Sequence, residues 1–87
     1  MRVAGLSMKG IGIYEGDVVV VDRSQQATNG KVVVAVVDGE FTLKRLCINS
    51  GYIELKAENP LVPSIKITED NQLEIWGTVV GVVRSLW

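Results

Sequence analysis

Short runs of β-branched residues, bounded by turn signals, constrain the fold of this chain most strongly. Residues 18–21 are all valine, and residues 31–38 contain a second valine-rich run with apolar side chains at successive positions. Such runs are too short for helices, and apolar residues at both parities indicate strands that are covered on both faces. Asn29-Gly30 and Asp38-Gly39 mark tight turns at the two ends of the second run.

The strand pattern continues to the end of the chain. We expect further strands at residues 40–47, 52–56, 65–67 and 73–83, and only a weak helical turn at residues 8–13. Gly77 and Gly81 in the last strand indicate bending or close backbone approach. The 87 residues are expected to form one domain, residues 1–87, that is mostly β and is built as a small, strongly curved sheet or partly open barrel.

Composition narrows the expected partners and cofactors. The basic and acidic residues are scattered and nearly balance, so direct nucleic-acid binding is not expected. The sequence offers no metal-ligand cluster, no apolar run of membrane-spanning length and no secretory leader. We therefore expect no metal or other cofactor and no membrane partner. The single Cys47 cannot form an internal disulfide, which also favours a cytoplasmic protein.

Catalytic chemistry is limited by the absence of histidine. A Ser-His-Asp arrangement is therefore excluded, and a neutral lysine is the remaining well-attested base for a nucleophilic serine. Ser7 lies beside a glycine-rich turn, and Lys44 lies in the strand expected after Asp38-Gly39. These two residues are the candidate catalytic pair.

The predicted hairpin indicates where Lys44 points. If Asp38-Gly39 form the loop, Lys44 lies opposite Val33 and Thr42 lies opposite Ala35. Side chains two positions apart share a face of a strand, so Lys44 is expected on an apolar face with the Thr42 hydroxyl beside it. Burial favours the neutral amine, and a hydrogen bond to Thr42 would orient that amine.

Simpler interpretations remain open for both residues. Lys44 can lay its methylenes along apolar surface and keep its ammonium group in water. The Ser7 hydroxyl can cap a local backbone amide. In that case the chain is an inert β interaction module with no catalytic role for either residue.

Several motifs resemble the self-cleaving Ser/Lys domain of the LexA and UmuD family, which has the fold of signal peptidases. Gly5-Leu6-Ser7-Met8 matches the nucleophile motif, and residues 37–46 match the segment that carries the catalytic lysine. Glu58-Asn59-Pro60 and residues 77–84 resemble two later family segments. Within residues 38–42, the sequence Asp-Gly-Glu-Phe-Thr is closer to UmuD than to LexA, whereas Leu6 matches the LexA branch.

The resemblance implies a mechanism and partners. Ser7 would attack a peptide carbonyl, and Lys44 would accept the hydroxyl proton and return it to the leaving amine. Backbone N–H groups of Leu6 and Ser7 would stabilise the oxyanion. In the family, a RecA filament triggers cleavage of the protein's own N-terminal arm during the SOS response to DNA damage. Processed UmuD-like members form homodimers and join a UmuC-like polymerase in the translesion DNA polymerase V.

This sequence lacks the arm that carries the cleavage site in the family. We therefore expect a processed, UmuD-like form of the domain that serves an error-prone polymerase. The alternative is the self-cleavage and dimerisation domain of a LexA-like or phage repressor.

Residues 79–87 form an apolar segment at the end of the chain. We expect them to form an uncovered edge strand that pairs with a second copy, because exposed edges invite pairing. The alternative is that this strand is central in the sheet.

Overall fold

The computed structural model describes residues 1–3, 5, 8–24 and 26–84, without the side chain of Lys9. The described chain contains one 3-10 turn, η1 (Lys9–Ile11), and six strands. The strands are β1 (Val18–Asp22), β2 (Val32–Val37), β3 (Glu40–Asn49), β4 (Tyr52–Lys56), β5 (Ile65–Ile67) and β6 (Leu73–Val83). The sequence-based strand predictions are therefore confirmed, and the weak helical turn is η1.

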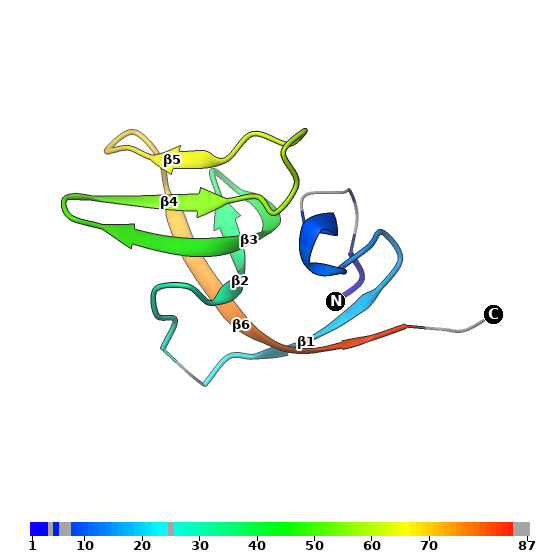
Figure 1. Ribbon diagram of the computed structural model, residues 1–87. Coiled ribbons are helices and arrows are strands. Elements are labelled where there is room, and N and C mark those ends of the chain that lie inside the picture. Colours follow the sequence, from blue (N-terminus) through cyan, green and yellow to red (C-terminus); the bar gives the residue numbers. More distant parts are fainter. Residues whose placement is uncertain (4, 6–7, 25, 85–87) are drawn as a thin grey trace.

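All six strands belong to one antiparallel sheet in the order β1-β6-β2-β3-β4-β5. The sheet is not closed, because β1 and β5 are its outer strands. Figure 1 shows β3, β4 and β5 stacked side by side, while β6 passes from β2 down to β1. A mostly β, curved and open sheet is the predicted fold class.

The hairpin between β2 and β3 has the predicted register. Asp38 and Gly39 both have positive φ angles, 50° and 87°, which is the backbone of the tight hairpin turn expected for Asp-Gly. Val33 pairs with Lys44, and Ala35 pairs with Thr42. The prediction that Lys44 and Thr42 lie on one face of β3, beside Val33 and Ala35, is therefore confirmed.

The last strand is not an outer strand of the sheet, because it lies between β1 and β2, but each half of its described length has a ladder partner on one side only. β6 pairs with β2 through Leu73–Thr78 and with β1 through Thr78–Val83. The register shifts once in each ladder, close to Gly77 and Gly81, and these bulges bend the strand. A Cβ atom on Gly77 would lie 2.4 Å from Val21 Cγ1, so close approach requires glycine there, whereas Gly81 has room for one.

Two apolar clusters form the core. Val33, Ala35, Leu46 and Leu55 are buried together on β2, β3 and β4. A second cluster joins the N-terminal segment and the loop before β1 to the sheet, and its buried members are Val3, Met8, Ile13 and Val19. This second cluster positions the chain on both sides of the predicted nucleophile. Within the described residues, η1 is the only helix and is too short to cross a membrane.

Candidate functional site

Lys44 lies on β3 with its side chain turned away from water. It is only 7% exposed, and it shares its face of the strand with buried Leu46 and its cross-strand neighbour Val33. The Nζ atom donates a hydrogen bond of 2.6 Å to Thr42 Oγ1. Burial lowers the pKa of Lys44, because removing water disfavours the charged amine. The interpretation in which the ammonium group extends into solvent therefore fails.

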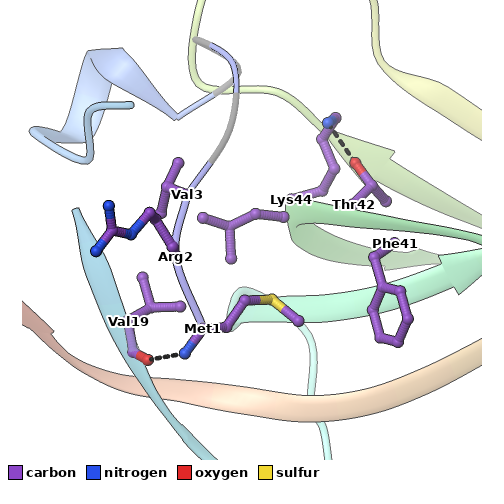
Figure 2. Close-up of a pocket in the computed structure, with 8 residues that line it drawn as sticks. Met1, Arg2, Val3, Val19, Phe41, Thr42 and Lys44 are labelled. Carbon is purple, nitrogen blue, oxygen red and sulfur yellow. Dashed lines mark hydrogen bonds between the residues drawn. The ribbon is translucent and has the colours of Figure 1, made fainter. Parts of the chain in front are cut away.

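A pocket of about 290 Å³ lies beside this amine. Figure 2 shows Lys44 and Thr42 at one end and Val3, Val19 and Phe41 along the rest of the pocket. Its wall is mainly apolar, with Met1, Arg2 and Leu43 completing it. Such a pocket suits an apolar chain segment whose reacting bond lies next to the amine.

The segment at residues 1–3 forms one wall of the pocket because it runs antiparallel to β1. Arg2 bridges Val18, and the Val3 N–H donates to the Asp17 carbonyl at 2.7 Å. Val3 and Met8, which lie on either side of Ser7 in the sequence, are buried in the same cluster.

Ser7 and Leu6 lie outside the described residues. The Ser7 nucleophile and the oxyanion N–H groups of Leu6 and Ser7 therefore stay predictions. The hydrogen bond between Lys44 and Thr42 is the geometry that sequence reasoning expected for the orienting hydroxyl. Among the described residues, no group of three or more histidine, cysteine or carboxylate side chains could hold a metal ion.

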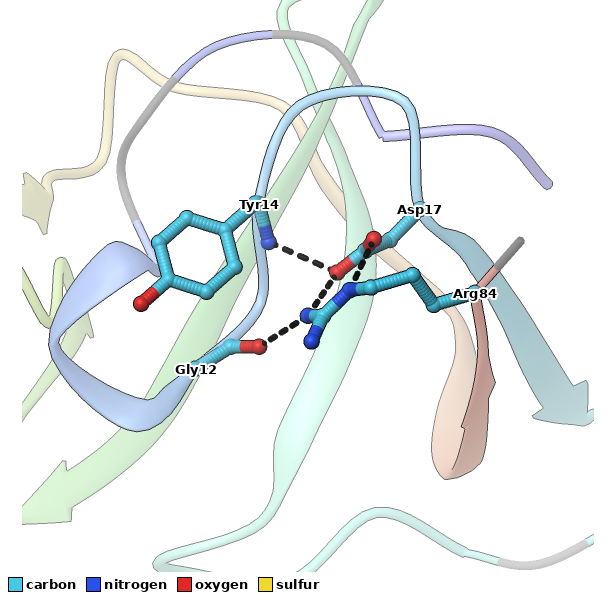
Figure 3. A network of polar contacts seen from close by, with 4 residues as sticks. All are labelled: Gly12, Tyr14, Asp17 and Arg84. Atoms are coloured by element: carbon cyan, nitrogen blue, oxygen red, sulfur yellow. Dashed lines mark hydrogen bonds and ion pairs between the residues drawn. The ribbon is translucent and has the colours of Figure 1, made fainter. Parts of the chain in front are cut away.

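Sequence reasoning missed a polar network at the end of the loop that follows Met8. The Asp17 carboxylate is 3% exposed. Figure 3 shows it accepting hydrogen bonds from Arg84 Nε at 2.8 Å and Nη2 at 2.6 Å, and from the Tyr14 N–H at 2.8 Å. Arg84 and then the Tyr14 N–H hold the pKa of Asp17 at about 2, below its usual 3.8. Asp17 therefore caps the Tyr14 N–H and pairs with Arg84 while it is shielded from water.

A second missed contact fixes η1 from the opposite side. The Gly10 N–H donates to the Glu58 carbonyl at 2.6 Å, and a Cβ atom on Gly10 would lie 2.0 Å from that oxygen. Glu58 is itself tied to β3 by an ion pair with Arg45, at 2.6 Å. The loop between Met8 and Asp17 is therefore attached to two residues that are distant in sequence, Glu58 in the connection between β4 and β5 and Arg84 just after β6.

Known proteins resemble the chain over almost its whole length. Residues 1–80 match the family described as Peptidase S24-like. The chain is 44% identical over 85 residues to the LexA repressor of Cupriavidus taiwanensis, covering 98% of this chain and 39% of that protein. It is 44% identical over 86 residues to the LexA repressor of Erwinia tasmaniensis, covering 98% and 43%. It is 46% identical over 84 residues to that of Syntrophotalea carbinolica, covering 97% and 42%. The chain spans about two fifths of the length of these curated relatives.

Proposed function

The chain belongs to the Peptidase S24-like family, and we propose that Ser7 and Lys44 form the catalytic dyad of a self-cleaving serine peptidase domain. The observation that carries the proposal is the desolvated Lys44 amine, which donates to Thr42 at the end of an apolar pocket. A neutral amine is a base, whereas a solvated ammonium group is not. The pocket offers that base to an apolar peptide segment.

The proposed reaction has two steps. Ser7 Oγ attacks the peptide carbonyl while Lys44 Nζ takes the hydroxyl proton, and the same amine gives that proton to the leaving nitrogen. Water then attacks the acyl-serine ester, with Lys44 accepting and returning a proton, so the serine is regenerated. The N–H groups of Leu6 and Ser7 would hold the oxyanion, at about 3–4 kcal/mol per donor in known proteases. The hydrogen bond to Thr42 Oγ1 would restrict the orientation of this amine.

For the wider protein, we propose the self-cleavage domain of a LexA-like repressor. The relatives cited above carry that name, and this supports the repressor alternative better than the UmuD-like, polymerase-associated form first expected. The UmuD-like motif at residues 38–42 does not outweigh these matches. On this proposal, the substrate is an arm N-terminal to the domain, the trigger is a RecA filament, and the reaction takes place in the cytoplasm.

We also propose that the domain forms a homodimer. Val79–Val83 pair with β1 on one side and have no ladder partner among the described residues on the other. Exposed valines gather on β1 and this end of β6: Val18, Val20, Val80 and Val83. Exposed apolar side chains gathered on neighbouring strands are typical of contact surfaces. Sedimentation velocity should show a dimer, and Val83→Lys should shift it toward the monomer. A monomer at high concentration would contradict this proposal.

A fluorophosphonate probe tests the catalytic proposal directly, because it reacts with activated serines. The parent chain should be labelled at Ser7, as located by mass spectrometry, and increasingly so as pH rises. Lys44→Ala should lower the labelling rate by about 10²- to 10⁴-fold, the usual contribution of a general base. Lys56→Ala, which changes an exposed lysine on β4, is the matched control. Labelling of the parent no faster than that of Ser7→Ala would refute the dyad.

A peptide-bond assay complements the probe. Tagged full-length LexA repressor of Cupriavidus taiwanensis serves as the substrate at alkaline pH. Samples that contain the Ser7→Ala chain report the substrate's own background cleavage. Extra cleavage by the parent, absent with Lys44→Ala, is expected. If all three chains give equal cleavage, the domain is an inert β module.

A further inference from the structure

The geometry points to a positioning role for Arg84: through Asp17 and Gly12, it holds the loop that directly follows Ser7, between Met8 and Asp17, and so keeps the proposed nucleophile in its reactive place. This inference rests on the proposed Ser7–Lys44 dyad. Arg84 follows β6 directly, on the side of the molecule where β6 pairs with β1. Its guanidinium group reaches back to the loop between Met8 and Asp17, which Figure 3 shows wrapped around it.

Contacts with three residues fix the guanidinium group in one orientation. Nε and Nη2 contact the two oxygens of Asp17, at 2.8 and 2.6 Å. Nη2 also donates to the Gly12 carbonyl at 2.6 Å, and the group stacks 5.0 Å from the centre of the Tyr14 ring. A planar, two-pronged contact of this kind defines direction as well as distance, which an apolar contact does not.

The loop transmits this restraint toward the serine. The Met8 carbonyl, in the residue that follows Ser7, accepts the N–H groups of Ile11 at 3.2 Å and of Ile13 at 3.3 Å. Gly12, which Arg84 contacts, lies between those two donors. A shift of Gly12 therefore moves the turn that is hydrogen-bonded to Met8. Met8 is fully buried, so its own side chain anchors the other end of that turn.

The two-pronged contact between Arg84 and Asp17 does more than add stability. The Asp17 carboxylate is buried, whereas the Arg84 side chain is 48% exposed, and the two groups are joined across distant parts of the chain. An ion pair with a solvent-exposed partner usually contributes little to stability. The restraint on direction is what the ion pair adds. A serine nucleophile requires this restraint, because a misplacement of about 1 Å can cost about 100-fold in rate.

The test compares Arg84, which directly follows β6, with Arg23, which directly follows β1. In the 87-residue chain, Arg84→Ala should slow fluorophosphonate labelling of Ser7 by about 10- to 100-fold at every pH. The pH at which labelling is half-maximal should stay that of the parent, because Arg84 does not contact Lys44. Arg84→Lys should recover part of the rate. Arg23→Ala is the control, since Arg23 also donates to a carbonyl, that of Trp76 at 2.8 Å, and stacks on its ring. It should leave the rate unchanged.

Amide hydrogen exchange supplies a readout that does not depend on catalysis. Arg84→Ala should speed exchange of the Tyr14 and Ile13 N–H groups while Val33 and Val34 on β2 stay protected, which also shows that the variant is folded. If Arg84→Ala does not fold, Asp17→Asn keeps the shape of the side chain and should give a smaller loss of rate. A folded variant of either kind that labels as fast as the parent would overturn the positioning role and leave the dyad intact. A parent no more reactive than Ser7→Ala would overturn the dyad, and the positioning role with it.

Discussion

Lys44 Nζ lies 2.6 Å from Thr42 Oγ1, on a face of β3 that is otherwise apolar. The two residues are one pleat repeat apart on the same strand, so the β conformation itself brings them together. The hydroxyl is the amine's described hydrogen-bond partner, and no carboxylate among the described residues forms an ion pair with it. Burial in these surroundings therefore lowers the pKa of Lys44 and shifts the amine toward its neutral form.

Thr42→Val should slow Ser7 labelling by about tenfold. The substitution keeps the shape of the side chain and removes the hydrogen bond to the amine. Such a bond contributes about 1–1.5 kcal/mol, and about 1.4 kcal/mol corresponds to a factor of ten in rate. Thr42→Ser keeps a hydroxyl at this position and should restore most of the rate. If Ser7 is labelled as fast in Thr42→Val as in the parent, or as slowly in Thr42→Ser as in Thr42→Val, then Thr42 does not orient Lys44.

Lys44→Met should stabilise the protein at neutral pH. The pKa of Lys44 is lowered by burial in the folded state, below its ordinary 10.5 in the unfolded chain. Between these two pKa values, the unfolded chain binds more protons than the folded one, so stability rises with pH. The advantage of the methionine variant should therefore be largest below this window and should shrink as the pH approaches 10.5.

Urea unfolding at a series of pH values measures this difference. Lys56→Met, at an exposed position on β4, controls for the loss of one positive charge. A stability difference that is constant, or that grows toward high pH, would argue against a desolvated amine.

Asp17→Asn should make the stability of the fold less dependent on pH in the acid range. The pKa of Asp17 is about 2 in the folded state and about 3.8 when unfolded, so the carboxylate stabilises the fold above that upper value. This contribution is lost as the pH falls through the lower value. Acid titration followed by circular dichroism should show a loss of stability in this range for the parent. A variant that loses stability over the same range as the parent would place the acid-sensitive group elsewhere.

Leu55→Ala should lower the free energy of unfolding by about 2–5 kcal/mol, the usual cost of emptying a packed leucine site. Leu55 is fully buried on β4, in the cluster with Val33 and Leu46. Leu61 is 90% exposed, so Leu61→Ala should change stability by no more than about 0.5 kcal/mol. Chemical denaturation measures both, and similar effects at the two sites would contradict the assigned core.

Local chemistry explains what the sequence could predict. Valine runs and the Asp38-Gly39 turn act over a few residues, so the strands, the hairpin register and the apolar face around Lys44 could all be inferred. The place of β6 depends on partners far away in the chain, and a valine-rich strand reads the same at an edge or in the middle. The Asp17–Arg84 and Gly10–Glu58 contacts also join distant residues, and no local pattern marks either pair.

Direct titration of the Lys44 side chain by NMR, with Lys44→Met to assign the signal, tests the central claim most directly. The account predicts a midpoint below 10.5, matching the pH at which labelling of Ser7 is half-maximal. A midpoint at or above that value would leave Lys44 charged wherever the protein is active, and Ser7 would have no base.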